Sequence, residues 1–289
     1  MKIGMIGLGK MGANMVERLR RDGHEVIGYS RSYTEEAKSL EDLVSQLPKP
    51  AVVWVMVPEG APTAANVQEL TGLMDEGDVI IDGGNSNFRE TIRRAADVEA
   101  AGIGWADAGT SGGVWGLTEG YSLMVGASAE TFDKIKPLCV TLAPPNGYAH
   151  VGPPGSGHFV KMVHNGIEYG MMQSFGEGFE ILRANQEFDL DLHQVAEVWR
   201  QGSVVRSWLL DLAASALEKD PDLESLKAYA ADSGEGRWTV LEAVNTGVAA
   251  PAISAALWAR FVSQQDESFA MKMVAALRRE FGGHAVKTD

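Results

Sequence analysis

The stretch GHFVKMVHNGIEYG, residues 157–170, concentrates polar side chains within an otherwise apolar helical pattern. Lys161, His164, Asn165 and Glu168 stand at positions i, i+3, i+4 and i+7, which share one face of a helix. A buried polar stripe is costly unless ligands or partners satisfy it, so we expect this face to line a binding site. A solvated helix face or a satisfied interior network would give the same pattern.

The types of these residues suit acid–base catalysis. A lysine acts as a general base only when its pKa is lowered, and partial burial lowers the pKa of an amine. Lys161 is therefore the predicted base. Glu168 lies farther along the same face and is placed to act as a second acid or base. His164 and Asn165 lie between them and complete the predicted catalytic set.

A glycine pattern near the N-terminus predicts a phosphate-binding turn. GLGKMG, residues 7–12, fits G-x-G-x-x-G between an apolar run and a helical pattern. Gly7 allows the tight turn, Gly9 lets a diphosphate approach the backbone, and Gly12 lets helix and strand pack closely. The helix N-terminus would face the phosphates. A glycine-rich turn without a ligand is the alternative. The remaining predicted cofactor contacts are Leu8, Lys10, Met11, Val57, Pro58 and Asn85.

The end of the second apolar run, EVIGYSR (25–31), indicates which dinucleotide is bound. NAD enzymes usually place Asp or Glu there to hold the ribose 2′-hydroxyl. This chain instead has Ser30, Arg31 and Ser32. Two hydroxyls and a guanidinium suit a 2′-phosphate, which predicts NADP, with NAD as a weaker alternative. Arg31 as an ordinary surface arginine is the competing interpretation.

The segment after Arg31 is short. Only 19 residues separate Arg31 from the strand expected to begin at Ala51. A helix, a strand, a second helix and their turns need about 28 residues. SLEDLVSQL (39–47) supplies one helix, and YTEEAK (33–38) cannot supply both of the other elements. We therefore expect a trimmed layer beside the adenosine pocket, so that either NADP is held with less support or the cofactor has no adenosine.

The elements that must position these residues predict an α/β fold in two domains. Residues 1–154 alternate apolar runs with helical patterns, which indicates a Rossmann-type, doubly wound domain with a parallel sheet. Residues 155–289 show only helical periods and predict an all-α domain. The expected strands lie at 2–9, 25–31, 51–58, 78–84, near 102–109 and at 121–127. The expected C-terminal helices lie at 157–185, 191–201, 204–218, 237–247, 251–264 and 266–281.

Composition excludes several classes of function. The formal charge is −14, and no long basic stripe interrupts it, so we expect the chain to bind neither nucleic acid nor anionic membranes. The single cysteine, Cys139, allows no intrachain disulfide and is expected to be a small buried hydrophobe. With no signal peptide and no membrane-length apolar run visible, we expect a cytoplasmic protein. The histidines show no metal-ligand spacing, so no metal is expected.

Several motifs resemble the decarboxylating 6-phosphogluconate dehydrogenases, in particular their short form within the β-hydroxyacid dehydrogenase superfamily. They are KMVHNGIEYG (161–170), DGGNS (82–86), SGG (111–113), GEGRWT (234–239) and FGGH (281–284). Together with the N-terminal glycines they cover nearly the whole chain. The resemblance implies oxidation of 6-phosphogluconate at C3 with Lys161 as base, loss of CO2, and protonation of C1 by Glu168 to give ribulose 5-phosphate.

The resemblance also assigns the substrate contacts. Asn85, Ser111, Gly112, Gly113, His164 and Asn165 would hold the hydroxyls and carboxylate of this phosphorylated sugar acid, near Glu168. Tyr169 and Arg260 would hold its phosphate. Arg278 and His284 would reach the site of a neighbouring subunit, because in this family the C-terminal tail crosses over. The chain is therefore expected to form a homodimer or homotetramer.

Two departures from the family keep alternatives open. Ser233 stands where larger members have a phosphate-binding lysine, and Arg237 is the candidate to compensate. The trimmed segment after Arg31 leaves room for the same reaction with an 8-hydroxy-5-deazaflavin coenzyme, which accepts hydride but carries no adenosine. A non-decarboxylating 3-hydroxyacid dehydrogenase and a non-catalytic NADPH-sensing protein are further alternatives. The stripe from Lys161 to Glu168 argues against the last of these.

Overall fold

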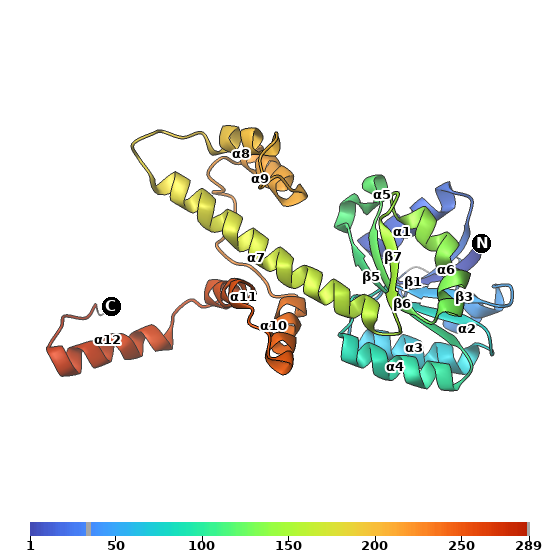
Figure 1. Ribbon diagram of the computed structural model, residues 1–289. Helices are drawn as coiled ribbons and strands as arrows, with labels where there is room; N and C mark the ends of the chain where they lie inside the picture. The colour runs from blue at the N-terminus through green and yellow to red at the C-terminus, as the bar shows by residue number, and fades with distance from the viewer. Residues whose placement is uncertain (33–35, 288–289) are drawn as a thin grey trace. The chain divides into compact units, whose positions relative to one another are not determined.

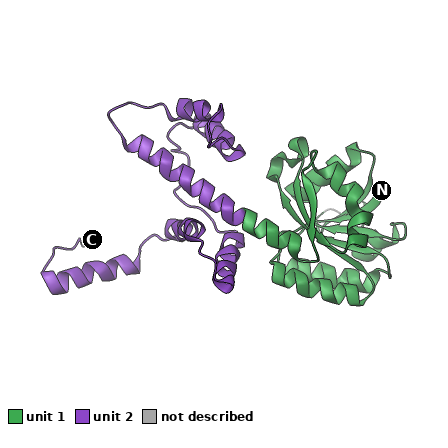
Figure 2. Ribbon diagram, in the orientation of Figure 1, with its two compact units in different colours: residues 1–164 green, residues 165–289 purple. Residues whose placement is uncertain are grey.

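The computed structural model describes residues 1–32 and 36–287. The chain divides into two compact units, Met1–His164 and Asn165–Asp289 (Figure 2). The division falls inside one long helix, α7 (Ser156–Ala184), which begins just after the domain boundary expected at residues 154 and 155. Each unit is described separately below.

The first unit is built on a sheet of seven strands in the order β2-β1-β3-β4-β5-β6-β7. Neighbouring strands are parallel, except that β6 runs antiparallel to β5. The predicted α/β class and strands are confirmed, and one further strand, β7, was not predicted. The strands are β1 (Lys2–Ile6), β2 (Glu25–Tyr29), β3 (Val52–Val55), β4 (Val79–Asp82), β5 (Gly104–Ser111), β6 (Ser122–Ala127) and β7 (Tyr148–Gly152).

Helices cover both faces of this sheet, as its continuous apolar strands require (Figure 1). On one face, α1 (Lys10–Arg21) and α6 (Ala129–Leu142) bury apolar side chains against the sheet. On the other face, α2 (Leu40–Ser45), α3 (Ala61–Leu73) and α4 (Phe88–Ala100) do the same. The short helices η1 (Gly113–Trp115) and α5 (Gly116–Glu119) lie between β5 and β6 in the chain.

Strand β2 forms one edge of the sheet. It pairs with β1, and β1 pairs with β3 on its other side. Within the described residues between β2 and β3, the helix α2 is the one regular element. The expected helix at 39–47 and the expected missing strand are thus confirmed in the described part of the chain. The part of that prediction concerning residues 33–35 lies outside the described residues.

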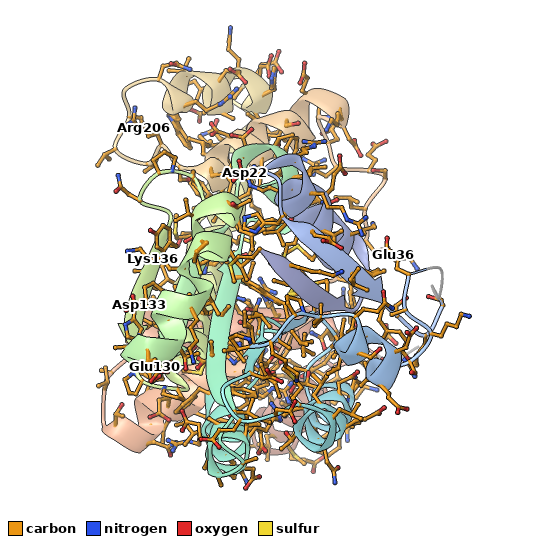
Figure 3. All side chains as sticks on the ribbon, turned by 90° about the vertical axis from the view of Figure 1, so that its right-hand side faces the viewer. Asp22, Glu36, Glu130, Asp133, Lys136 and Arg206 are labelled. Atoms are coloured by element: carbon orange, nitrogen blue, oxygen red, sulfur yellow. The ribbon has the colours of Figure 1, made fainter. Side chains whose placement is uncertain are left out.

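An ion pair covers the open edge of β2. Arg20 donates from Nη2 to the carbonyl oxygen of Val26 at 2.6 Å, and the Gly28 N–H donates to Glu36 Oε2 at 2.6 Å. Arg20 and Glu36 also pair with each other at 2.7 Å. Glu36 lies on the segment that follows β2 (Figure 3). The pair therefore satisfies one backbone carbonyl oxygen and one backbone N–H of β2 that would otherwise bond to a further strand.

Cys139 lies in the core formed by α6 and the sheet. Its side chain is fully buried, as the sequence predicted. Burial raises the pKa of the Cys139 thiol to about 12. The thiol is therefore protonated at neutral pH and packs as a small apolar group.

The second unit is helical throughout its described residues. It contains most of α7, then α8 (Leu192–Arg200), α9 (Trp208–Lys219), α10 (Glu235–Thr246), α11 (Pro251–Ser263) and α12 (Phe269–Gly282). All six predicted C-terminal helices are confirmed. Helices α8 and α9 share one apolar cluster, and α10 and α11 share another with Tyr169 of α7. None of the helices in the described ranges has the length and apolar character needed to cross a membrane.

Candidate active site

The glycine turn after β1 has the geometry of a phosphate-binding loop. Gly7 has φ +93°, and a Cβ atom there would lie 2.3 Å from the carbonyl oxygen of Met56. A Cβ atom at Gly12 would lie 1.9 Å from the carbonyl oxygen of Gly7, whereas one at Gly9 would meet nothing within 4 Å. The N-terminus of α1 has no side-chain cap. The turn is thus tight at Gly7 and Gly12 and open where a diphosphate would approach.

The predicted cofactor-selecting residues follow the edge strand β2. Arg31 and Ser32 are exposed, and Ser30 is partly buried. A cavity of about 660 Å³ lies alongside, and α1 contributes both apolar and charged residues to its lining. Its lining includes Leu8, Ser30 and Ser32 from the predicted set, together with Glu36. This cavity lies between α1 and the end of β2 with the segment that follows it.

The loop after β4 places Asn85 against the end of β5. The Asn85 Nδ2 group donates to the Thr110 carbonyl oxygen at 3.1 Å, and the Thr110 N–H donates to Asn85 Oδ1 at 2.9 Å. Asp82 anchors the same loop, because its carboxylate accepts from Ser86 Oγ at 2.8 Å and from the Gly84 N–H at 3.0 Å. Asn85 therefore has a fixed orientation, with φ +52°, at the carboxyl ends of the parallel strands.

Lys161 begins the polar face of α7 close to the sheet. Its side chain is only 5% exposed, and its Cβ lies 2.5 Å from the position a Cβ atom would take on Gly109. One turn later, His164 Nε2 lies 3.5 Å from Ser111 Oγ at the end of β5. The first unit thus brings four of the predicted site residues, Lys161, His164, Ser111 and Asn85, to one end of the sheet.

The glycines after Ser111 continue this region. Gly112 and Gly113 have φ +128° and +53°, both in the left-handed region that favours glycine. Val57 is partly buried and Pro58 exposed, directly after β3, and the Val57 carbonyl oxygen lies 2.7 Å from the Cβ position of Gly84. In the glycine turn, Leu8 and Met11 are partly buried and Lys10 is exposed.

In the second unit, the segment 232–238 folds against α7. Asn165 Nδ2 donates to Glu235 Oε2. Tyr169 is 4% exposed, and its hydroxyl accepts from the Ser233 N–H at 3.0 Å and donates to Asp232 Oδ1 at 3.2 Å. The Ser233 Oγ lies 3.0 Å from the same hydroxyl. Tyr169 and Ser233, both expected near the phosphate, are therefore adjacent.

Two arginines border this segment. The guanidinium carbon of Arg260 lies 3.4 Å from the ring centroid of Tyr169, and its Nη1 donates to the Ala231 carbonyl oxygen at 2.8 Å. Arg237 is paired with Asp232 at 2.7 Å. The second unit thus places Arg260 over the Tyr169 ring, while the Tyr169 hydroxyl and Arg237 both contact the Asp232 carboxylate.

The remaining predicted residues are less constrained. Glu168 is partly buried on α7. Arg278 and His284 are exposed, on α12 and just after it, and the His284 ring packs edge-on against Phe281 with centroids 6.0 Å apart. No side chain of α12 is buried. Within the single chain, these two residues are not assembled with Tyr169 or Arg260 by any hydrogen bond or ion pair of the described residues.

Sequence reasoning missed several side chains that organise the site. Asp82 anchors the loop that carries Asn85, while Asp232 and Glu235 contact Tyr169 and Asn165. Each lies inside or beside a motif noted above, so the motifs marked the region but not the individual contacts. The signal that could have found them is a carboxylate within an otherwise apolar or glycine-rich segment.

Comparisons with known proteins agree over the whole chain. A profile described as the NAD binding domain of 6-phosphogluconate dehydrogenase matches residues 2–152, and one described as the C-terminal domain of 6-phosphogluconate dehydrogenase matches residues 157–287. A Bacillus subtilis protein, YqeC, which carries a provisional 6-phosphogluconate dehydrogenase name, is 46% identical over 99% of both chains. An NAD(+)-dependent, decarboxylating 6-phosphogluconate dehydrogenase of Haloferax volcanii is 43% identical over 99% of this chain and 98% of its own.

Solved structures give the same picture. A Plasmodium falciparum 6-phosphogluconate dehydrogenase, solved in apo form and with NADP+ or 6-phosphogluconate, matches with a TM-score of 0.85 and 30% identity. The match covers 100% of this chain and 66% of that one. A Mycobacterium tuberculosis 3-hydroxyisobutyrate dehydrogenase matches with a TM-score of 0.73 at 21% identity, which shows a shared fold alone.

Proposed function

The chain belongs to the 6-phosphogluconate dehydrogenase family, and on that premise we propose that it converts 6-phosphogluconate to ribulose 5-phosphate and CO2 by oxidative decarboxylation. The observation that carries the proposal is the position of Lys161. This lysine is almost fully buried at the end of the sheet where the glycine turn, Asn85 and Ser111 also lie. A buried amine among hydrogen-bonding groups is suited to proton transfer.

The proposed mechanism uses Lys161 twice and Glu168 once. The bound cofactor supplies the hydride acceptor for C3 of the substrate. Lys161 accepts the proton of the 3-hydroxyl as the hydride leaves, which produces a β-keto acid. After the bond between C1 and C2 breaks and CO2 leaves, Lys161 returns its proton to the carbonyl oxygen at C3. Glu168 then protonates C1 of the enediol, so that two groups serve proton transfers at different atoms.

Substrate recognition is proposed to use residues from several elements. The hydroxyls and the carboxylate are held by Asn85, Ser111, Gly112, Gly113, His164 and Asn165. The phosphate is held by Tyr169 and Arg260. Ser233, which stands where a lysine occurs in larger members, lies against Tyr169, and Arg237 supplies a cation nearby. A bidentate arginine contact compensates a lost lysine contact in charge and in hydrogen bonds.

The cofactor is proposed to be NADP. The open backbone at Gly9 and the uncapped N-terminus of α1 fit a diphosphate. Ser30, Arg31 and Ser32 fit a 2′-phosphate. Glu36 lies near the end of β2 but is held by Arg20 and the Gly28 N–H, so it is not placed as the acid that holds a ribose 2′-hydroxyl in NAD enzymes. The Haloferax volcanii relative is named NAD(+)-dependent, which keeps NAD as a competing cofactor.

A second candidate cofactor rests on the edge strand. Because β2 has no strand beyond it, the layer that supports adenosine in a full dinucleotide fold is missing from the described part of this chain. An 8-hydroxy-5-deazaflavin coenzyme accepts hydride without an adenosine, and its anionic tail suits the N-terminus of α1. This observation favours the deazaflavin over NAD or NADP only if adenosine support is essential for binding.

A cofactor screen separates these candidates. Purified protein with 6-phosphogluconate is offered NADP, NAD and the oxidised deazaflavin in separate assays, and acceptor reduction is followed by absorbance. NADP is expected to be reduced, and Arg31→Ala is expected to raise the KM for NADP about 10-fold to 100-fold, since it removes a charge-assisted hydrogen bond. The KM for NAD serves as the matched control and should stay constant. Reduction of the deazaflavin alone would replace NADP by the second candidate.

The assembly is proposed to be a homodimer or homotetramer, with Arg278 and His284 entering a neighbouring site. Support comes from α12, on which Phe269, Leu277 and Phe281 are more than half exposed. Apolar side chains gathered on one helix usually mark an interface between chains. We also propose a cytoplasmic location, because the single thiol suits a reducing compartment.

A further inference from the structure

The first turn of α7 is fastened to the sheet by a buried carboxylate. Asp107, in β5, is fully buried. Its Oδ1 accepts from the Gly155 N–H at 2.6 Å, and its Oδ2 accepts from the His158 N–H at 2.8 Å. The first N–H groups of a helix have no partner within the helix. Asp107 therefore caps α7 from a neighbouring strand rather than from the helix's own sequence.

The side chain of His158 makes a second contact that holds the first turn of α7 in place. Its Nδ1 lies 2.8 Å from Thr91 Oγ1 on α4, and the ring is only 1% exposed. The Thr91 hydroxyl also lies 3.1 Å from the Asn87 carbonyl oxygen at the start of α4. Strand β5 and helix α4 thus both hold the residue that lies three positions before Lys161.

Glycines allow the backbone of the first turn of α7 to contact the sheet directly. A Cβ atom on Gly157 would lie 2.4 Å from the carbonyl oxygens of Asp107 and Met124. A Cβ atom on Gly126 would lie 2.7 Å from the Gly157 nitrogen. A Cβ atom on Gly109 would lie 2.5 Å from Lys161 Cβ and 2.7 Å from the Gly157 carbonyl oxygen. With backbones in direct contact, a shift of the first turn must move the side chain of Lys161.

Burying the carboxylate of Asp107 costs desolvation free energy. Burial is the largest cause that raises the pKa of its carboxyl, while the charge on His158 and the two backbone N–H groups act in the opposite direction. A carboxylate that is costly to ionise in the folded state is poorly explained by stability alone. Its two hydrogen bonds both go to the first turn of the helix that carries the proposed base.

We propose that Asp107 is a positioning residue for Lys161: by capping the first turn of α7 it fixes where the lysine amine meets the 3-hydroxyl of the substrate. The inference rests on the proposed function in that it takes Lys161 as the base. Asp107 itself touches no reacting atom. His158 and Thr91 support the same placement from α4.

The test is Asp107→Asn, which keeps the size of the side chain but turns one acceptor into an amide that faces a backbone N–H. Because misplacement of a reacting group by about 1 Å costs roughly 100-fold in rate, kcat is expected to fall about 10-fold to 100-fold. KM for 6-phosphogluconate and the Kd of the cofactor are expected to change less than about 3-fold, since substrate binding is not what Asp107 controls.

A double-variant cycle shows whether Asp107 acts through Lys161. In the Lys161→Ala background, adding Asp107→Asn is expected to leave the residual kcat unchanged, because there is no base left to misplace. Multiplied losses in the double variant would overturn the proposal, as would a raised KM with kcat intact. If Lys161→Ala alone retained full activity, the proposed function would fail instead, which is a distinguishable result.

A milder variant covers the case in which Asp107→Asn does not fold. Thr91→Val removes the partner of His158 at nearly constant volume and is expected to lower kcat in the same direction without raising KM. Thr131→Val is the matched control. Thr131 is a buried threonine on α6 that is hydrogen-bonded to Ser128, away from α7. Equal kcat values for the two threonine variants would contradict the proposal that the contact between His158 and Thr91 helps to position Lys161.

Discussion

Replacing Lys161 by alanine is expected to lower kcat about 1,000-fold to 10,000-fold, because the variant lacks both the base for the 3-hydroxyl and the cation that stabilises the enolate. Lys161 lies in α7, whereas the proposed cofactor contacts lie in the glycine turn and in the segments that follow β2, β3 and β4. The Kd of the cofactor, measured by titration with the reduced form, is therefore expected to stay within about 2-fold of the parent value.

Lys136→Ala is the control for the loss of a lysine as such. Lys136 is exposed on α6 (Figure 3) and takes no part in the proposed site. This variant should retain parental kcat and cofactor binding. Turnover by Lys161→Ala at a rate close to that of Lys136→Ala would remove the lysine from the mechanism.

The second large effect is expected for Glu168→Gln, which keeps the shape of the side chain but cannot donate a proton as a carboxylic acid. Protonation of C1 is reversible, so the parent enzyme should exchange the C1 hydrogen of ribulose 5-phosphate with deuterium from heavy water. The variant is expected to lose this exchange by about 100-fold or more and to lower kcat by a similar factor. Proton NMR of the recovered ribulose 5-phosphate measures the exchange.

Glu180→Gln supplies the matched control, because Glu180 is an exposed glutamate on the same helix. It should exchange deuterium at the parental rate. Exchange that survives in Glu168→Gln would assign the protonation of C1 to another group and leave Glu168 as a substrate contact at most.

Much of the fold could be predicted because its signals are local. The strands of the first unit are continuous apolar runs, and the helices of the second unit repeat apolar residues with helical period. The shortened segment after Arg31 could be recognised by counting residues, and the edge position of β2 follows from it. Strand β7 was missed because YAHVG is largely exposed and short, so it has neither an apolar run nor a clear alternation.

The site could be predicted only where it lies on one element. The polar face from Lys161 to Glu168 follows from helical spacing alone. The cap of α7 by Asp107 joins residues 48 positions apart, and the covering of β2 by Arg20 and Glu36 joins a helix to a loop. Neither contact produces a periodic pattern of residue types in the sequence. Pairing over such distances depends on how the whole sheet assembles.

The most direct test of the proposed reaction is its carbon balance. The protein is given 6-phosphogluconate labelled with ¹³C at C1 together with the acceptor found in the cofactor screen, and ¹³CO2, reduced acceptor and ribulose 5-phosphate are quantified together. We predict one ¹³CO2 and one ribulose 5-phosphate for each acceptor reduced, with unphosphorylated gluconate turned over far more slowly. Reduction of the acceptor without ¹³CO2 would contradict oxidative decarboxylation and identify a non-decarboxylating 3-hydroxyacid dehydrogenase instead.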